Sequence, residues 1–323
     1  MRGTLGIAIV AVCATATLAA CDGRMPVKPR SGGNPYEVVV MADNDTARNA
    51  VAEALQQPVK GLPQAEKAFD LTLTKGSTLN QATRYARCIV VVSTGKDEMP
   101  ATSIKYERDV YARPQLLVRV SSATAGRLCA DMMSVRSHLA RLINRFETAD
   151  AVAQLRKRHN AEAAKAVSEV TGCTLLVPAD MTYSKRGRDF IWLTDNAAKG
   201  LQSLCIYTYP GTDTRAATVT ERRDSVMKAN LPGERTGTFM RTDTGSRLYR
   251  RTFRKGERQV TEVRGLWEME GDAMGGPFVC HAVADSARGR TVVAEAFVYA
   301  PEGPKRNLTR QLEAALLTLR LTK

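Results

Sequence analysis

Residues 128–146 read LCADMMSVRSHLARLINRF, and they predict the helix around which the rest of the chain is arranged. Six apolar residues recur in this stretch at alternating steps of four and three: Leu128, Met132, Val135, Leu139, Leu142 and Phe146. That spacing places them on one face of a helix. The pattern continues to Val167, with a kink expected near Thr148, and Gly172 ends it. We therefore expect a long central helical segment that packs on both halves of the chain.

The half that precedes this helix mixes strands with helices. Strands are predicted over residues 36–41, 68–74, 88–93, 105–111 and 115–120, and helices over 47–57 and 79–86. Cys88–Ser93 is almost wholly apolar, which is typical of an interior strand. Arg113-Pro114 separates the last two strands, because proline cannot donate to a strand ladder.

The half that follows the helix has strands in succession. They are predicted over residues 173–177, 189–194, 204–209, 236–241, 248–254, 259–269, 277–283 and 291–299, with a hairpin turn at 184–187 and helices over 220–230 and 306–319. Strands and helices do not alternate regularly, so we predict an α+β fold with mixed or antiparallel sheets. The expected lobes are an N-terminal α/β lobe, 34–170, and a mostly antiparallel α+β lobe, 171–323.

The first thirty-three residues predict export and anchoring. Arg2 precedes an uncharged, largely apolar run, and small residues then lead to Cys21, which is the layout of a signal peptide. Leu18-Ala19-Ala20-Cys21 resembles the bacterial lipobox, in which the thiol is acylated before cleavage. We expect a signal peptide over 1–20, a lipidated Cys21 with a flexible tether over 21–33, and a body that is anchored to a membrane and faces the periplasm. A soluble protein cut after Ala20 is the alternative.

The charge of the chain suggests an anionic partner. The formal net charge is +14, and loss of Arg2 with the signal peptide lowers it to +13. Residues 215–258 contain twelve Lys and Arg against five Asp and Glu. A basic face beside a membrane attracts anionic lipid, so an anionic lipid or an envelope protein is the expected partner. Nucleic acid is the usual partner of a strongly basic protein, but an exported protein is separated from the nucleic acid of the cell. Arginines scattered over a solvated sheet face are the alternative.

The cysteines favour buried thiols over a metal site. Five remain after Cys21: Cys88, Cys129, Cys173, Cys205 and Cys280. None forms a Cys-x-x-Cys pair, the chain has only 3 histidines, and four of the five lie in or beside apolar runs. We predict no metal and no cofactor, and the spacing leaves any disulfide pairing open.

Residues 264–281, RGLWEMEGDAMGGPFVCH, contain the densest group of candidate site residues. If two strands pair across the glycines, Glu268 or Asp272 can approach His281, and a carboxylate beside a histidine is the minimum for acid–base catalysis. Arg264 and Trp267 are the candidate binding residues, with Arg264 suited to an anionic substrate. The alternative is a glycine hairpin with a capping Asp272 and a core Trp267. The common nucleophile, zinc and nucleotide motifs do not occur in the sequence.

Long irregular stretches carry a resemblance to a known family. They are residues 34–38, 61–63, 105–115, 222–233, 263–267, 271–278, 297–301 and 305–308. The chain resembles a family of envelope lipoproteins from Bacteroidetes that is known only as a domain of unknown function. This resemblance implies a lipoprotein and brings no activity, cofactor or partner with it.

Two functional hypotheses follow from the sequence. The first is a membrane-anchored binding or assembly factor of the periplasm, with the basic 215–258 segment and the 263–281 loop as contact surfaces. The alternative is a lipid-anchored hydrolase that acts on envelope glycan or lipid through Asp272, Glu268 and His281.

Overall fold

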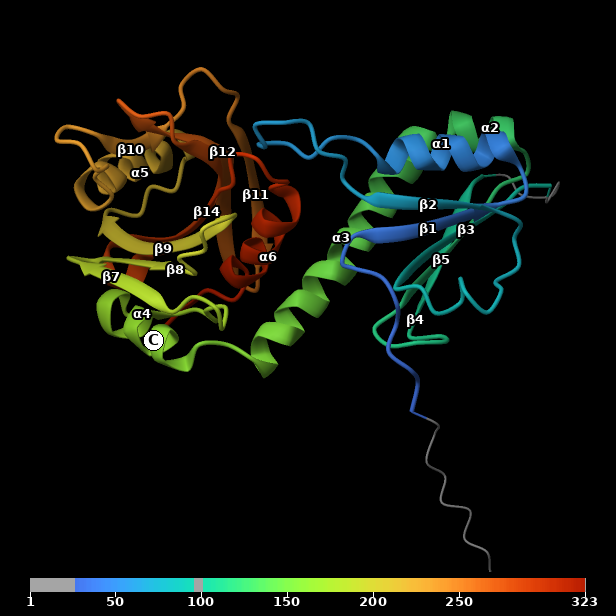
Figure 1. The fold of residues 1–323 in the computed structure, drawn as a ribbon, viewed down its shortest axis with the longest axis horizontal. Helices are drawn as coiled ribbons and strands as arrows, with labels where there is room; N and C mark the ends of the chain where they lie inside the picture. Colours follow the sequence, from blue (N-terminus) through green and yellow to red (C-terminus); the bar gives the residue numbers. More distant parts are fainter. Residues whose placement is uncertain (1–26, 96–100, 323) are drawn as a thin grey trace, which may run out of the picture.

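The computed structural model describes residues 27–95 and 101–322, and the expected signal peptide and Cys21 lie outside them. The chain has an α+β fold, as predicted. Two sheets lie on either side of the long helix α3 (Met132–Lys157), which runs diagonally between them (Figure 1). No helix in the described part of the chain is long and apolar enough to cross a membrane.

The N-terminal sheet has five strands in the order β2-β1-β3-β5-β4. Their bounds are β1 (Glu37–Ala42), β2 (Asp70–Lys75), β3 (Cys88–Ser93), β4 (Ser103–Arg108) and β5 (Leu116–Ser121). All pairs are parallel except β4 with β5. The apolar strand β3 lies at the centre, which confirms its prediction as an interior strand.

Helices cover one face of this sheet. They are α1 (Asp45–Leu55), α2 (Ala125–Ala130) and the first half of α3, which together pack on alternate residues of the strands. Asn44 begins α1, because its side chain accepts a hydrogen bond from the Ala47 amide. The other face holds a smaller cluster around Met41, Ile89 and Leu117, against loop residues.

The helix α3 is continuous through Thr148, where a kink was expected. The helical region breaks later, at Arg158, and restarts as α4 (Ala161–Thr171). The side chain of Asn160 accepts from the Ala163 amide and caps α4, which favours a new helix start at this point. Gly172 ends α4 with a φ of 61°, as predicted.

The C-terminal lobe is built on an eight-stranded antiparallel sheet. The main path runs β10-β12-β13-β14-β9-β8-β7, and β11 pairs with β12 beside it. The bounds are β7 (Tyr183–Gly187), β8 (Phe190–Thr194), β9 (Leu201–Pro210), β10 (Phe239–Thr242), β11 (Tyr249–Lys255), β12 (Arg258–Glu270), β13 (Gly275–Asp285) and β14 (Arg290–Tyr299). Short strands β6 (Cys173–Thr174) and β15 (Arg320–Leu321) pair separately.

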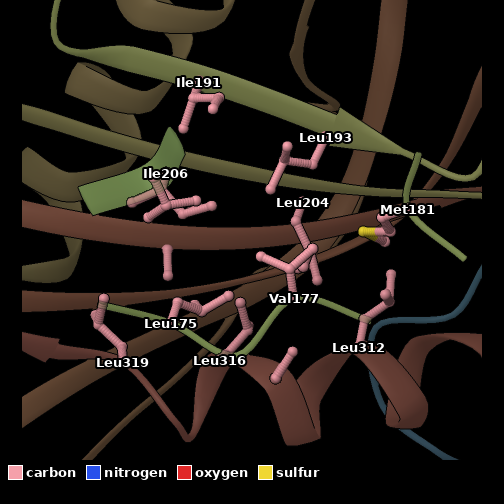
Figure 2. Packing of buried hydrophobic residues seen from close by; sticks show 14 of the residues in the cluster. Leu175, Val177, Met181, Ile191, Leu193, Leu204, Ile206, Leu312, Leu316 and Leu319 are labelled. Atoms are coloured by element: carbon pink, nitrogen blue, oxygen red, sulfur yellow. The ribbon is translucent and has the colours of Figure 1, made fainter. Parts of the chain in front are cut away.

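Each face of the large sheet has its own core. The helices α4 and α6 (Arg306–Leu316) cover one face, where Leu204, Ile206, Leu312 and Leu316 are among the packed residues (Figure 2). The helix α5 (Ala216–Asn230) covers the other face, around Trp267 and its aromatic neighbours.

Two local predictions are wrong. Residues 79–86 form turns instead of a helix, because the Asn80 side chain accepts from the amides of Ala82 and Thr83 and competes with the helical pattern. Residues 184–187 belong to the strand β7, and the turn falls at residues 188–189, where Asp189 has a φ of 54°.

The last residues of the expected tether, 21–33, are hydrogen-bonded to the N-terminal lobe. The Pro29 carbonyl accepts from the Arg113 amide at 2.9 Å, and the Gly32 amide donates to the Tyr85 carbonyl at 2.9 Å. The residues of the tether from Pro29 onward are therefore fixed to the N-terminal lobe.

Glu66 joins the two lobes through the start of α6. It lies on the loop between α1 and β2, which Figure 1 shows reaching toward the C-terminal lobe. Its carboxylate accepts from the amides of Lys305 and Arg306 at 2.7 and 2.9 Å. A carboxylate at this position satisfies free amides and complements the positive end of the helix dipole. Arg306 in turn pairs with Asp70 of β2.

Candidate anion-binding cleft between the lobes

A cleft of about 990 Å³ lies between the lobes, and two helices, two strands and a loop form its walls. The helix α3 contributes residues spaced by three or four, from Arg145 through Ala149 and Val152 to Arg156, which share one face. The helix α6 contributes Arg310 and Glu313, and Leu317 follows directly after its last residue. The other walls are the strands β11 and β12 and the loop around residues 59–68. We call this site the interlobe cleft.

The interlobe cleft is strongly cationic. Eight of its lining residues are Lys or Arg, and two, Glu262 and Glu313, are acidic. Within the described residues, six of the cations have no carboxylate within 4.0 Å. These six are Lys60, Arg145, Arg156, Arg247, Arg250 and Arg310. Since the cations outnumber the acids four to one, the cleft suits an anionic ligand.

Arg310 is the cation most withdrawn from water among these six. Its guanidinium lies 4.1 Å from the ring centroid of Tyr36 and 5.5 Å from that of Phe69. One nitrogen donates to the Ala68 carbonyl at 2.7 Å. Burial lowers the pKa of Arg310 below its ordinary value, the Glu313 carboxylate opposes this in part, and the charges of Arg306 and Arg264 lower it further. The aromatic rings offset part of this cost, but a full negative charge in the cleft would offset more.

Arg264 lines the cleft on β12, and its side chain is held in place from three sides. Nη2 pairs with Glu313 at 2.7 Å, and Nε lies 3.6 Å from Glu262. Gly61 has a φ of +76°, and an added Cβ there would lie 3.2 Å from the Arg264 side chain. Burial acts to lower the pKa of Arg264, but Glu313 and Glu262 raise it above its ordinary value. Arg264 is therefore fixed and charged, and its role in binding an anion stays a prediction.

Glu262, and not Glu268 or Asp272, is the carboxylate beside His281. The two residues are opposite each other on β12 and β13, and Nε2 of His281 lies 3.1 Å from Oε2 of Glu262. Arg251 binds the same carboxylate through two hydrogen bonds of 2.7 and 2.6 Å. Burial opposes ionisation of Glu262, but His281 and Arg251 hold its pKa well below the usual range.

The predicted acid–base group is therefore not assembled. Glu268 lies six residues from Glu262 along β12, which places it about 20 Å from His281 at roughly 3.3 Å per residue. It pairs with Arg241 at 2.7 Å. Asp272 is exposed on the β12–β13 turn, where it accepts from the Ala273 amide. Strand pairing across the glycines occurs as expected, but its register brings a different carboxylate to the histidine.

His281 is itself poorly placed for catalysis. It is only 3% exposed, and the ring of Phe253 packs edge-on against it at 5.4 Å between centroids. The Glu262–His281–Arg251 cluster therefore stabilises the wall of the cleft and orients its arginines. The hydrolase hypothesis required Asp272 or Glu268 beside His281, and the structure does not bring either carboxylate to this histidine.

Trp267 is a core residue. It is 2% exposed, its Nε1 donates to the Val298 carbonyl at 3.3 Å, and its ring packs against Phe297 at 5.5 Å between centroids. Successive strand residues point to opposite faces, so residues three apart, such as Arg264 and Trp267, do not share a face. The two candidate binding residues thus separate, and only Arg264 lines the cleft.

Residues 160–318 match a domain of unknown function (DUF4837). Residues 31–157 match a second domain of unknown function (DUF8532). The two matches meet near Arg158, where α3 ends. No curated protein matches the chain.

The cysteines and acids of the described residues form no metal site. No group of three or more His, Cys, Asp or Glu side chains is placed to hold a metal ion in residues 27–95 and 101–322. Cys88, Cys173, Cys205 and Cys280 are buried, as predicted, and Cys129 is exposed. All five are free thiols, a point that the sequence left open.

Sequence reasoning missed Arg310 and the α3 arginines. The basic 215–258 segment gave part of the signal, because Arg247, Arg250 and Arg251 of that segment do line the cleft. Arg223 of the same segment is fully buried instead, where it pairs with Glu295. A run of charge shows that cations are present, but it does not show which of them face the same space.

Proposed function

We propose that this protein is a membrane-anchored binding protein of the cell envelope whose interlobe cleft takes an anionic ligand. Arg310 is the observation that carries the proposal. It is a half-buried guanidinium with no ion-pair partner in the described residues, and it faces a cleft where cations outnumber carboxylates. A ligand with phosphate or carboxylate groups supplies the missing charge and matches the planar donors of arginine.

The anchor rests on the first residues of the sequence. Leu18-Ala19-Ala20-Cys21 fits a lipobox, and the resemblance to Bacteroidetes envelope lipoproteins points the same way. Pro29 is bound to the N-terminal lobe, and only seven residues separate it from Cys21. A chain extends at most about 3.6 Å per residue, so the body would lie within about 30 Å of its anchor. Anionic lipid head groups or envelope glycans are then within reach of the cleft.

Binding is tested with the full mature chain and inorganic pyrophosphate by isothermal titration calorimetry at low salt. The wild type is expected to bind, and Arg310→Met is expected to weaken binding by about tenfold or more, in line with a charged hydrogen bond. Arg310→Lys keeps the charge and loses the planar fork, so an intermediate loss is expected.

Arg188→Met is the matched control, since Arg188 is exposed on the β7–β8 turn outside the cleft. Thermal melts of all variants verify that they are folded. If the wild type does not bind pyrophosphate, or if Arg310→Met binds as well as the Arg188 control, the cleft is not an anion site.

The anchor is tested by mass spectrometry of the protein purified from its native cells. A diacylated or triacylated Cys21 at the amino terminus is expected, and Cys21→Ser should move the protein from the membrane fraction to the soluble fraction. An unmodified Cys21, or a retained Met1, would show that the membrane anchor is wrong while leaving the cleft proposal to its own test.

A further inference from the structure

A second pocket of about 660 Å³ continues the interlobe cleft along α3. The two share Val152, Arg156 and Leu317 as lining residues. We call the two together the trough. From Arg145 to Arg156 the shared helix alone extends about 16 Å, at 1.5 Å per residue. The trough is therefore longer than one phosphate or carboxylate group needs.

The second pocket is cationic throughout. Four of its lining residues are cations, namely Arg156, Lys165, Lys255 and Arg320, and none is acidic. Lys165 lies 3.9 Å from Glu169 on the exposed side of α4. Arg156, Lys255 and Arg320 have no carboxylate within 4.0 Å in the described residues. Adjacent cations repel one another, so their grouping in a hollow lowers the stability of the empty protein.

Lys255 is the least exposed of these four cations. Its ammonium group is half-buried at the end of β11 and donates to the Leu319 carbonyl at 2.6 Å. Burial, together with the charge of Arg320, lowers the pKa of Lys255 to about 8. Within the part of the chain that the structure describes, this ammonium group has no carboxylate within 4.0 Å, so an anion bound in the pocket would stabilise its charge.

We propose that the trough binds a linear polyanion, with one anionic group at Arg310 in the interlobe cleft and further groups along Arg156 toward Lys255. This inference rests on the proposed function and adds to it the chain-like nature of the ligand. A single anion fills one end of the trough, whereas a chain with repeated phosphate or carboxylate groups meets cations along its whole length.

The test compares pyrophosphate with long-chain linear polyphosphate, again with the full mature chain. The wild type is expected to bind the long chain at least about tenfold more tightly per site, since linked groups bind with a high effective concentration. Lys255→Met is expected to weaken long-chain binding about fivefold or more and to change pyrophosphate binding less than about twofold. Arg310→Met should weaken the binding of both.

Lys199→Met is the control, because Lys199 is exposed and lines neither part of the trough. Lys165→Met is a second test variant whose side chain is exposed, so its loss does not disturb the core. If both Lys variants bind the long chain like the wild type while Arg310→Met loses pyrophosphate, the ligand is a single anion and this inference is wrong although the proposed function stands. If no phosphate probe binds to the wild type, the proposed function fails first.

A carboxylate polymer separates two sources of the same chemistry. Poly-L-glutamate is tested as a competitor of polyphosphate. If it competes, and if Lys255→Met binds it more weakly than the wild type does, the trough accepts a chain of carboxylates as well as a chain of phosphates. Competition by polyphosphate alone indicates a phosphate-bearing chain.

Discussion

Arg223 and Glu295 are the most deeply buried ion pair of the described residues. Both side chains are 0% exposed, and their closest atoms are 2.8 Å apart. The guanidinium of Arg223 also lies 4.0 Å from the ring centroid of Phe278 and donates to Thr242. Burial acts to lower the pKa of Arg223, but the Glu295 carboxylate raises it above its ordinary value. Burial raises the pKa of Glu295, and the charge of Arg223 opposes that rise. The pair joins α5 to the large sheet.

Replacement of Glu295 by Ala should lower the free energy of unfolding by about 3–5 kcal/mol, because it removes the fully buried partner of Arg223 and leaves only the partly exposed Asp224 beside the buried charge. The double variant Arg223→Met with Glu295→Leu should recover most of that loss, since a buried pair is often no more stabilising than apolar residues of similar size. Urea unfolding of the three proteins measures both effects. If Glu295→Ala is as stable as the wild type, Glu295 does not stabilise the buried charge of Arg223.

The cleft arginines differ from Arg223 in this respect. Arg223 has two carboxylates, a hydroxyl and a ring as partners, whereas Arg310 has rings and a carbonyl. A cation that serves only the fold is normally matched when it is buried. The incomplete matching of Arg310 is the residue-scale reason to expect a ligand.

At the scale of elements, the position of α6 decides the shape of the cleft. Glu66 of the N-terminal lobe supplies the cap of this helix from 239 residues away in sequence. The same helix then presents Arg310 and Glu313 to the cleft and packs Leu312 and Leu316 into the core of the large sheet. A change at the amino terminus of α6 is therefore expected to alter the positions of Arg310 and Glu313 in the cleft.

Substitution of Glu66 by Ala should reduce stability by about 1–2 kcal/mol through loss of the cap. Faster hydrogen exchange is expected at the amides of Lys305 and Arg306, with weaker pyrophosphate binding. Glu66→Gln keeps one acceptor and should show a smaller effect. The control is Glu302→Ala, an exposed acid just before the helix. Equal exchange rates in Glu66→Ala and the control would show that this cap does not hold α6.

At the scale of the whole molecule, the trough should give binding a characteristic pH dependence. Below about pH 8, Lys255 is charged and attracts the polyanion, and as the pH rises through 8 it loses its proton and the attraction falls. Affinity for long-chain polyphosphate is therefore expected to be full at pH 7 and reduced at pH 9. Arg156, Lys165 and Arg320 are the other charged groups that line the same pocket.

The affinity for long-chain polyphosphate is measured at pH 7 and pH 9 for the wild type, Lys255→Met and Lys165→Met. Because all three proteins bind the same ligand, comparing them removes the effect of pH on the ligand itself. The Lys255 variant should lose most of the pH dependence, and the Lys165 variant should keep it. Binding to Lys255→Met that falls with pH as steeply as in the wild type would assign the effect to another group.

The sequence by itself determined the classes of element and most of their positions. Period-two and period-3.6 patterns are local, so the strands β1, β3 and β5 and the helix α3 follow from residues that are close in the chain. Errors occurred where short-range side-chain bonds competed with the pattern, as at Asn80 and Asn160. Turn chemistry overrode helix propensity at both positions.

Only the tertiary structure decided which side chains meet. The register of β12 and β13 placed Glu262 beside His281 and turned Trp267 to the opposite face, and a register is fixed by packing of the whole sheet. The cleft collects residues from positions as far apart as Tyr36 and Arg310. Periodic patterns describe residues that are close in the chain, so they do not predict contacts between residues this far apart. Those contacts depend on how the two lobes pack on α3.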